Sequence, residues 1–317
     1  FYKNNFNLND WGYYQIVRNT AKQIAPNDAN MQTMLSWFLM TRSNYKSRLS
    51  YSDNKLFLLL ACSNEIYGKV YFVFNNIKYY CFEDSPGSVY SYDKDFPEAR
   101  IVMDLNIYSP LATGLVKREK DVQFEYEGQN FPVKITFNQN TIDFYKDVPL
   151  SDIKVYFDAV LSVETKESLI NNLSPLLKDK SEKEAVSILL AMVQKSFEYK
   201  TDQDQFGYEK FFFPDELFYY PYSDCEDRSA LFSYLVRELV KLEVIGLHYP
   251  GHMATAVKFT SDIDGDYIMY KDKKYIICDP TYIGAPIGMA MPQYVNTEAQ
   301  VVDLRGSEHN AEIRQKI

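Results

Sequence analysis

The spacing of apolar residues divides the first third of the chain into helical and extended stretches. The helical stretches are followed by short apolar runs: residues 11–25 and 31–40, then 55–61, 69–74 and 78–82. Asn75-Asn76 stands between the last two runs, which is typical of a tight β-hairpin. Residues 85–97 are rich in Ser, Pro, Gly, Asp and Tyr and are expected to form a linker. Residues 1–97 are therefore predicted to form an N-terminal α+β region.

The next part of the chain, 98–163, is predicted to be a small β-sandwich. Five stretches show alternation with a period of two or are short apolar runs: 101–107, 122–126, 133–137, 141–145 and 153–157. Turn-forming residues such as Glu127-Gly128 separate them. Several short strands at this spacing are typical of a sandwich.

The last part, 164–317, changes from helical to strand-like patterning. Residues 184–197 carry a helical apolar stripe, a polar and aromatic loop spans 200–222, and a second stripe begins after Cys225. Strand-like stretches then follow at 244–249, 252–259 and 274–278. This order predicts an α+β core in which a helix packs on an antiparallel sheet.

Composition excludes some classes of function. The 317 residues carry a net charge of −9, so no basic surplus is available to neutralise nucleic acid or an anionic membrane surface. No apolar run reaches the 18 residues needed for a transmembrane helix. Because the chain starts at Phe1 rather than Met, we expect an upstream segment to have been removed, and this is compatible with a periplasmic or secreted location. The oligomeric state is left open.

The four cysteines contain no Cys-x-x-Cys pair, so a zinc ribbon is not expected. Cys62 and Cys81 could meet on neighbouring strands, and the sequence leaves open whether they form a disulfide or are two buried thiols.

Cys225 stands where a loop turns into a helix. Ser223 is a suitable N-cap, and Glu226 three residues later completes a predicted capping box. Cys225 is then in the first helical turn, where free backbone N–H groups and the helix dipole favour an anion. A thiolate there would be a nucleophile. The alternative is a small buried hydrophobic residue.

A thiol nucleophile needs a base, and the base needs an orienting group. His252 stands at the start of one predicted strand and Asp279 at the end of the next. Adjacent antiparallel strands can bring these positions side by side. His248 is a competing base, but its place in an apolar strand is more typical of a packed or surface histidine.

The order of Cys225 at a helix start, Gly251-His252 opening a strand and Ile277-Cys278-Asp279-Pro280 ending another resembles the transglutaminase-like superfamily, whose fold is related to papain-like cysteine proteases. The resemblance covers about residues 180–285. It implies a Cys225–His252–Asp279 triad that attacks peptide or side-chain amides through a thioester, without a cofactor. The bacterial multidomain relatives imply water as acceptor and a peptide or protein substrate, which could be linked to cell wall or glycan. An amine acceptor would make the protein a transglutaminase, and loss of turnover would leave a peptide- or glycan-binding scaffold.

The sequence also departs from the family. Ser223 stands where family members often carry Gly. Three carboxylates, those of Asp224, Glu226 and Asp227, surround the thiol, and negative neighbours raise a thiol pKa.

Oxyanion stabilisation requires hydrogen-bond donors. The backbone N–H of Cys225 is one candidate, and Gln205, Tyr220 and Tyr222 are candidate side chains for the oxyanion site or the substrate groove. The stretch 262–266 lacks the full spacing of a calcium loop and is better explained as a hairpin turn. We therefore predict no metal.

The N-terminal region parallels the last third of the chain. Moving one along the other by 196 residues sets 31–40 against 227–236, Ala29 against Cys225, and Leu56 against His252. Residues 1–97 are hypothesised to be a copy of the same fold without catalytic residues, the alternative being chance similarity. A structure without a helix packed on strands 55–83 would contradict the hypothesis.

Overall fold

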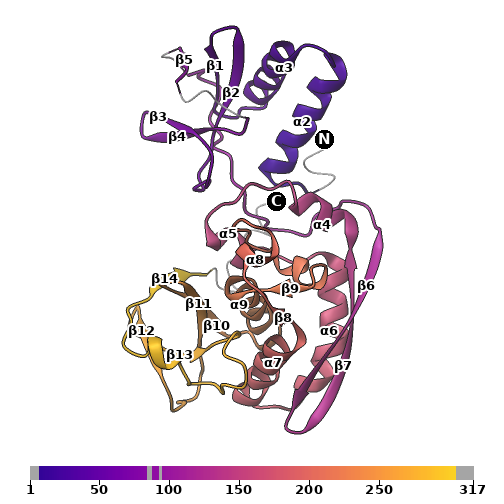
Figure 1. The fold of residues 1–317 in the computed structure, drawn as a ribbon, viewed down its shortest axis with the longest axis vertical. Coiled ribbons are helices and arrows are strands. Elements are labelled where there is room, and N and C mark those ends of the chain that lie inside the picture. Colours follow the sequence, from indigo (N-terminus) through magenta and orange to yellow (C-terminus); the bar gives the residue numbers. More distant parts are fainter. Residues whose placement is uncertain (1–6, 84–87, 93–94, 305–317) are drawn as a thin grey trace. The chain divides into compact units, whose positions relative to one another are not determined.

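The computed structural model describes residues 7–83, 88–92 and 95–304. The chain divides into two compact units, which are described separately here. Unit 1 comprises Phe1–Ile107 with Asp147–Asp152, and unit 2 comprises Tyr108–Lys146 with Ile153–Ile317 (Figure 1). In the described ranges, no helix is both long and apolar enough to cross a membrane.

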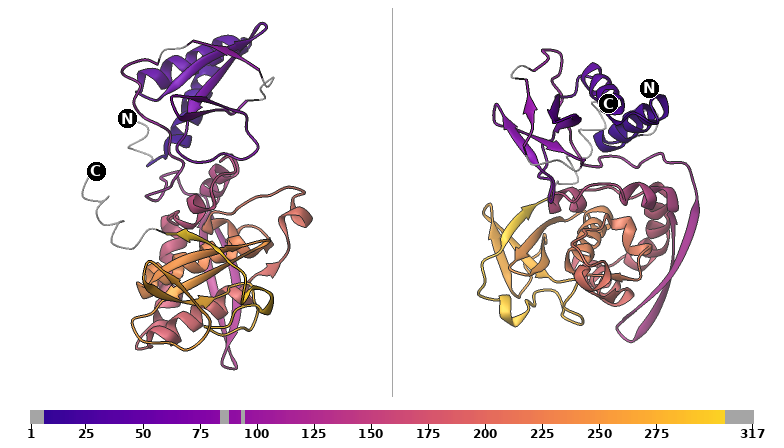
Figure 2. Two further views of the ribbon diagram at one scale, coloured as in Figure 1. Left: turned by 90° about the vertical axis from the view of Figure 1, so that its left-hand side faces the viewer. Right: turned by 45° about the horizontal axis from the view of Figure 1, so that its top comes forward.

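Unit 1 contains two helices on one side of a curled antiparallel sheet (Figure 2). Its elements are α2 (Asp10–Ile24), α3 (Ala29–Arg42), β1 (Ser47–Ser52), β2 (Lys55–Ala61), β3 (Tyr71–Phe74), β4 (Ile77–Cys81) and β5 (Tyr90–Ser91). The sheet order is β3-β4-β2-β1-β5. Helix α3 packs on β1 and β2, so the hypothesis of a copied fold survives the test set for it.

Local chemistry explains the boundaries of these elements. The Asn9 side chain accepts a hydrogen bond from Gly12 N (3.0 Å) at the start of α2, and Asp28 does the same for Met31 N (2.9 Å) at the start of α3. Asn75 and Asn76 have positive φ angles of 50° and 62°, as a two-residue hairpin turn requires. The predicted hairpin between β3 and β4 is confirmed.

Unit 2 contains helices packed on a second curled antiparallel sheet. Its helices are α4 (Gln139–Tyr145), α5 (Ile153–Phe157), α6 (Val163–Leu177), α7 (Glu182–Ser196), α8 (Asp202–Gln205) and α9 (Cys225–Leu235), with 3₁₀ turns at Pro214–Phe218 and Pro292–Tyr294 and a π turn at Val236–Val240. Its strands are β6 (Lys117–Tyr126), β7 (Gln129–Asn138), β8 (Glu198–Tyr199), β9 (Tyr222–Ser223), β10 (Glu243–Tyr249), β11 (His252–Lys258), β12 (Tyr267–Tyr270), β13 (Lys273–Cys278) and β14 (Gln300–Asp303). The sheet order is β12-β13-β11-β10-β14, and α9 packs on β11.

The predicted β-sandwich over 98–163 is wrong. Two of the five stretches form the β6–β7 ribbon, two form helices α4 and α5, and residues 101–107 make only isolated bridges at Ile101 and Met103. Asn138 caps α4 by accepting a hydrogen bond from Asn140 N (3.1 Å). Ile142 and Tyr145 are both buried, at a spacing of three residues that suits a helix. A five-residue apolar run fits either period, and here the cap decided for the helix.

The expected linker at 85–97 lies partly outside the described residues. Within it, β5 pairs with β1 and so belongs to the sheet of unit 1. Cys62 and Cys81 are free, buried thiols rather than a disulfide.

Candidate active site

Cys225 is the first residue of α9, so the prediction that it lies in the first helical turn is confirmed. The predicted cap is displaced by one residue. Asp224 is the N-cap, and the Asp227 carboxylate accepts a hydrogen bond from Asp224 N (3.2 Å). Ser223 instead lies in β9, where its Oγ accepts a hydrogen bond from Arg228 Nε (3.1 Å). The helix itself is buried along nearly its whole length, which holds its first turn against β11.

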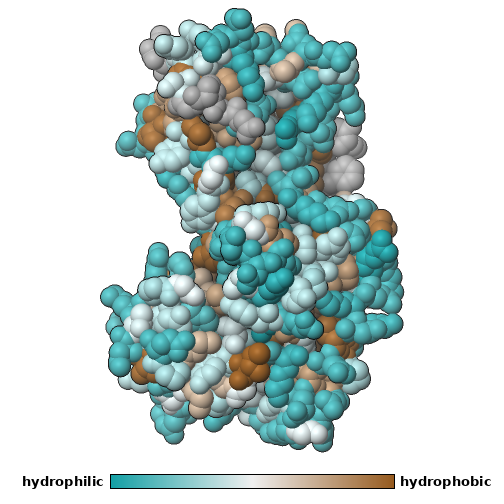
Figure 3. All heavy atoms as spheres, in the orientation of Figure 1, coloured by the Kyte–Doolittle hydropathy of each residue, from teal (hydrophilic) through white to brown (hydrophobic). Residues whose placement is uncertain are grey.

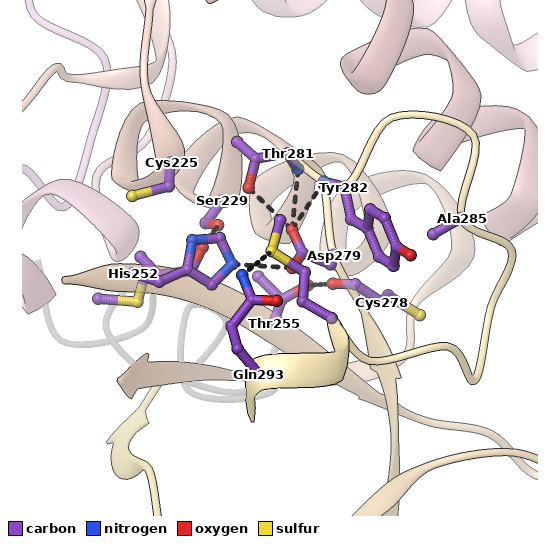
Figure 4. A network of polar contacts seen from close by, with 12 residues as sticks. Cys225, Ser229, His252, Thr255, Cys278, Asp279, Thr281, Tyr282, Ala285 and Gln293 are labelled. Atoms are coloured by element: carbon purple, nitrogen blue, oxygen red, sulfur yellow. Dashed lines mark hydrogen bonds and ion pairs between the residues drawn. The ribbon is translucent and has the colours of Figure 1, made fainter. Parts of the chain in front are cut away.

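The strand register brings His252 and Asp279 together. Thr255 on β11 pairs with Cys278 on β13, so the start of one strand lies beside the end of the other. His252 Nε2 lies 2.8 Å from Asp279 Oδ2, and both side chains are buried. Figure 4 shows the imidazole between Cys225 and Asp279.

The second carboxylate oxygen of Asp279 is also held. Oδ1 accepts hydrogen bonds from Thr281 N (2.9 Å), Thr281 Oγ1 (2.8 Å) and Tyr282 N (3.1 Å) (Figure 4). These donors fix the carboxylate so that Oδ2 points at the imidazole. Such an arrangement selects one tautomer of the ring and stabilises its charged form.

Two tyrosines hold the imidazole ring. Tyr294 stacks on His252 with ring centroids 5.0 Å apart and an angle of 9°, and Tyr249 stacks on Tyr294 at 4.9 Å. Nδ1 of His252 makes no hydrogen bond with any residue that the structure describes. The ring therefore has one nitrogen committed to Asp279 and one available for proton transfer.

The thiol of Cys225 is turned toward its neighbour Glu226. Sγ donates a hydrogen bond to Glu226 Oε2 (3.0 Å) and also receives one from the backbone of Met253, the residue after His252. Ser229 Oγ donates to Met253 O (3.2 Å) and ties α9 to the same strand. The thiol and the imidazole thus lie at one end of β11, but the thiol proton is directed to a carboxylate rather than to the imidazole.

Three buried carboxylates gather beside the thiol. The oxygen atoms of Asp202, Asp224 and Glu226 lie within 4.8 Å of one another, and we call this set the acidic cluster. Burial, reinforced by the charge of the neighbouring carboxylates, raises the pKa of Asp202 to about 7 and that of Asp224 to about 8. Burial also raises the pKa of Glu226. These groups therefore hold protons close to neutral pH.

The acidic cluster is the one group of His, Cys, Asp and Glu side chains in the described ranges that is compact enough to hold a metal ion. Its donors are all carboxylate oxygens, which suit a hard cation such as Ca²⁺ or Mg²⁺. The absence of a metal stays a prediction.

The environment of Cys225 disfavours the thiolate. Burial is the largest cause of the raised pKa of the thiol, followed by the charge of Glu226, the hydrogen bond to Glu226 and the charge of Asp224. The N–H donor of Met253 acts in the opposite direction. A thiol with a raised pKa requires the imidazole to remove its proton during the reaction.

The three candidate side chains for the oxyanion site have other partners or positions. Gln205 ends the short helix α8, Tyr220 stacks on Phe212 with centroids 4.7 Å apart, and the Tyr222 ring lies 5.0 Å from Lys200 Nζ. None of the three makes a hydrogen bond with Cys225 in the described structure. Their proposed role stays a prediction.

Sequence reasoning missed Gln194, which supports the site from α7. Nε2 donates to the backbone oxygens of Asp279 (2.9 Å), Tyr282 (2.9 Å) and Ala285 (3.1 Å), and Oε1 accepts from Gly284 N (3.2 Å). Only 3% of Gln194 is exposed. A glutamine inside the apolar stripe of 184–197 was the available signal, because a buried polar side chain requires partners.

The search for relatives gives no family assignment, since neither a protein-family model nor a curated protein sequence matches this chain.

Proposed function

We propose that unit 2 is a thiol-dependent amide or peptide hydrolase with a Cys225–His252–Asp279 triad. The observation that carries the proposal is the 2.8 Å contact between His252 Nε2 and Asp279 Oδ2, at the strand end whose backbone contacts the Cys225 thiol. The fold implied by the transglutaminase-like resemblance belongs to the same proposal.

The proposed reaction begins with a rotation of the Cys225 side chain away from Glu226 toward His252 Nδ1. The imidazole takes the thiol proton, and sulfur attacks the carbonyl carbon of the amide. The resulting oxyanion is stabilised by the backbone N–H of Cys225. The imidazolium then donates its proton to the leaving amine, which leaves a thioester on Cys225. Water, activated by the neutral imidazole, hydrolyses the thioester and regenerates the thiol.

Asp279 acts on this sequence without transferring a proton itself. Its carboxylate keeps the proton of the neutral imidazole on Nε2, so Nδ1 is the basic nitrogen. The same carboxylate stabilises the imidazolium that forms after proton transfer. An amine in place of water would give transglutaminase-type acyl transfer through the same thioester.

A non-catalytic peptide- or glycan-binding scaffold is the second candidate function. The hydrogen bond from the Cys225 thiol to Glu226 and the raised pKa of the thiol favour it, because both stabilise the unreactive protonated form. The aromatic residues of the loop before α9, which include Phe206, Phe212 and Tyr220, could contact such a ligand.

Alkylation of Cys225 by iodoacetamide as a function of pH separates the two candidates. A catalytic thiol paired with imidazole should react below pH 8, and His252→Ala should slow the reaction. The other cysteines, Cys62, Cys81 and Cys278, are buried, so peptide mapping can assign the label to Cys225. Reaction only at high pH, with no effect of His252→Ala, would favour the scaffold.

The substrate is proposed to be a peptide or protein, which could carry cell-wall or glycan linkages, and the proposed location is periplasmic or secreted. A screen of peptide libraries and cell-wall fragments with the wild type against Cys225→Ala would identify the bond that is cleaved. No product from any substrate, despite a reactive thiol, would contradict hydrolysis of these classes.

A further inference from the structure

The two sheets of this protein have the same order and the same register. In unit 1 a two-residue turn joins β1 and β2, and Ser52 pairs with Lys55; in unit 2 the corresponding turn joins β10 and β11, and Tyr249 pairs with His252. The counterpart of His252 is therefore Lys55, at an offset of 197 residues. This corrects the sequence-based alignment, which set Leu56 against His252.

The second hairpins also correspond. Phe74 pairs with Ile77 across one turn and Tyr270 with Lys273 across the other, an offset of 196 residues. An independent strand pair checks both offsets, since Leu59 pairs with Cys81 in unit 1. The offsets turn this pair into Ala256 and Ile277, which are partners in unit 2.

These offsets locate the counterparts of the proposed triad. Glu83 corresponds to Asp279, because each follows the end of its strand. The helix starts agree as well, since Asp28 and Asp224 are the N-caps of α3 and α9, and Ala29 then corresponds to Cys225. Unit 1 thus replaces a thiol by a methyl group and an imidazole by an amine.

The three counterparts line one cavity. Ala29, Lys55 and Glu83 all contribute to a space of about 380 Å³ between α2, α3, β2 and the end of β4. This volume is in the range of small-molecule sites. Unit 1 has therefore kept a cavity at the position where unit 2 has its candidate active site, although the chemistry of the nucleophile is gone.

The cavity carries a surplus of positive charge. Arg18 and Lys22 on α2 line it together with Lys55, whereas Glu83 is the one acidic side chain in its wall. Arg18, Lys22 and Lys55 make no ion pair with any described residue. The Nζ of Lys55 lies 4.9 Å from the centre of the Phe57 ring, so its position is defined by a contact within the sheet.

A buried hydroxyl also faces the cavity. Ser36 on α3 lines the wall and is only 5% exposed, yet it has no hydrogen-bond partner among the described residues. Thr33 beside it donates to Ala29 O (3.0 Å) and is satisfied. An unpartnered hydroxyl in a largely buried position is unfavourable unless a ligand or water accepts its hydrogen bond.

We propose that this cavity in unit 1 binds a small molecule through a phosphate or carboxylate group. Arg18, Lys22 and Lys55 supply the charge, and Ser36 donates a hydrogen bond to the anionic oxygen. Hydrophilic residues dominate α2 and α3 on the face shown in Figure 3, as expected for a polar ligand rather than an apolar one. The site is independent of the proposed hydrolase function, because it contains neither Cys225 nor His252.

The protein carries its own reporter for this site. Both tryptophans of the chain, Trp11 and Trp37, lie in unit 1. The Trp11 ring contacts the edge of Phe82, which lines the cavity, with centroids 4.9 Å apart. Tryptophan fluorescence of the full chain therefore reports on this unit alone.

The test is a fluorescence titration of the full chain with inorganic phosphate and, separately, with acetate, at constant ionic strength. We expect a saturable change with at least one of the two anions, and the more effective one identifies the group. Lys55→Gln and Arg18→Gln should each weaken binding about tenfold or more, whereas Lys55→Arg should keep most of it. Lys69→Gln, at a lysine of the same unit outside the cavity, is the matched control.

Circular dichroism of each variant checks that its fold is intact. No saturable change with either anion, or equal weakening by Lys69→Gln and Lys55→Gln, would overturn the proposal. Binding that is unaffected by Lys55→Gln and Arg18→Gln in folded protein would overturn it as well.

Discussion

The Sγ atom of Cys225 lies 3.0 Å from Oε2 of Glu226, its neighbour in the first turn of α9. The proposed base, His252, is committed to Asp279 through Nε2 and has Nδ1 free of any contact with described residues. The conformation therefore combines an oriented imidazole with a thiol that is protected by a carboxylate. Reactivity depends on how easily the thiol leaves Glu226.

Replacing Glu226 by Gln should make Cys225 more reactive. The substitution removes a negative charge and a hydrogen-bond acceptor for the thiol proton, both of which raise the thiol pKa. A pKa lower by about one unit corresponds to about tenfold more thiolate below the pKa, so alkylation near pH 7.5 should accelerate by about that factor. Glu298→Gln, at an exposed position of the same unit, is the control. An unchanged rate in Glu226→Gln would mean that burial alone sets the pKa.

Asp279→Asn should reduce turnover without unfolding unit 2. The amide can still accept hydrogen bonds from Thr281 and Tyr282, but it no longer stabilises the imidazolium of His252. We expect kcat/KM for a cleaved substrate to fall on the order of 10²- to 10⁴-fold. Asp264→Asn, at an exposed aspartate, should have no effect. Wild-type turnover by Asp279→Asn would remove this residue from the mechanism.

The acidic cluster should make the protein less stable as the pH rises. The folded-state pKa values of Asp202 and Asp224, about 7 and about 8, are above the ordinary aspartate value of 3.8, so the folded protein binds more protons than the unfolded chain. The stability contributed by these groups is present below about pH 4 and is lost as the pH rises toward 8. The slope is at most about 1.4 kcal/mol per pH unit for each group.

Urea denaturation at pH 5 and pH 8 measures this dependence. The free energy of unfolding should be lower at pH 8, and the double variant Asp202→Asn/Asp224→Asn should show a smaller difference. Added Ca²⁺ at pH 8 distinguishes protonation from cation binding, because a bound cation would restore stability in the wild type only. Equal pH dependence in the double variant and the wild type would show that other groups dominate.

Gln194→Leu should destabilise unit 2 and lower activity together. The substitution leaves the backbone oxygens of Asp279, Tyr282 and Ala285 without their side-chain donor in a buried place. Unsatisfied buried groups cost about 1–3 kcal/mol each at most, and we expect a total loss of about 2 kcal/mol or more in urea denaturation. Gln194→Glu, which keeps the shape and the acceptor but loses the amide donor, should show a similar loss. A stable but inactive Gln194→Leu variant would instead assign the residue a role in positioning Asp279 alone.

Long or strongly punctuated patterns were predicted correctly from the sequence. Helices α2, α7 and α9 have apolar stripes and polar caps, and the β3–β4 hairpin has an Asn-Asn turn that accepts positive φ angles. These features depend on interactions between residues a few positions apart. Short runs such as 141–145 and 153–157 were assigned to strands and are helices, because five residues do not distinguish a period of 2 from a period of 3.6.

The sequence by itself also determined the residue types of the candidate site: a cysteine at a helix start, a histidine opening a strand and an aspartate ending the next. The tertiary structure decided what these residues contact. The β11–β13 register set the 2.8 Å contact of His252 with Asp279. The return of the chain at α8 brought Asp202 to the thiol, and the identical registers of the two sheets aligned Lys55 with His252. Such contacts join residues far apart in the chain, and only the packing of helices on the two sheets determines which of them meet.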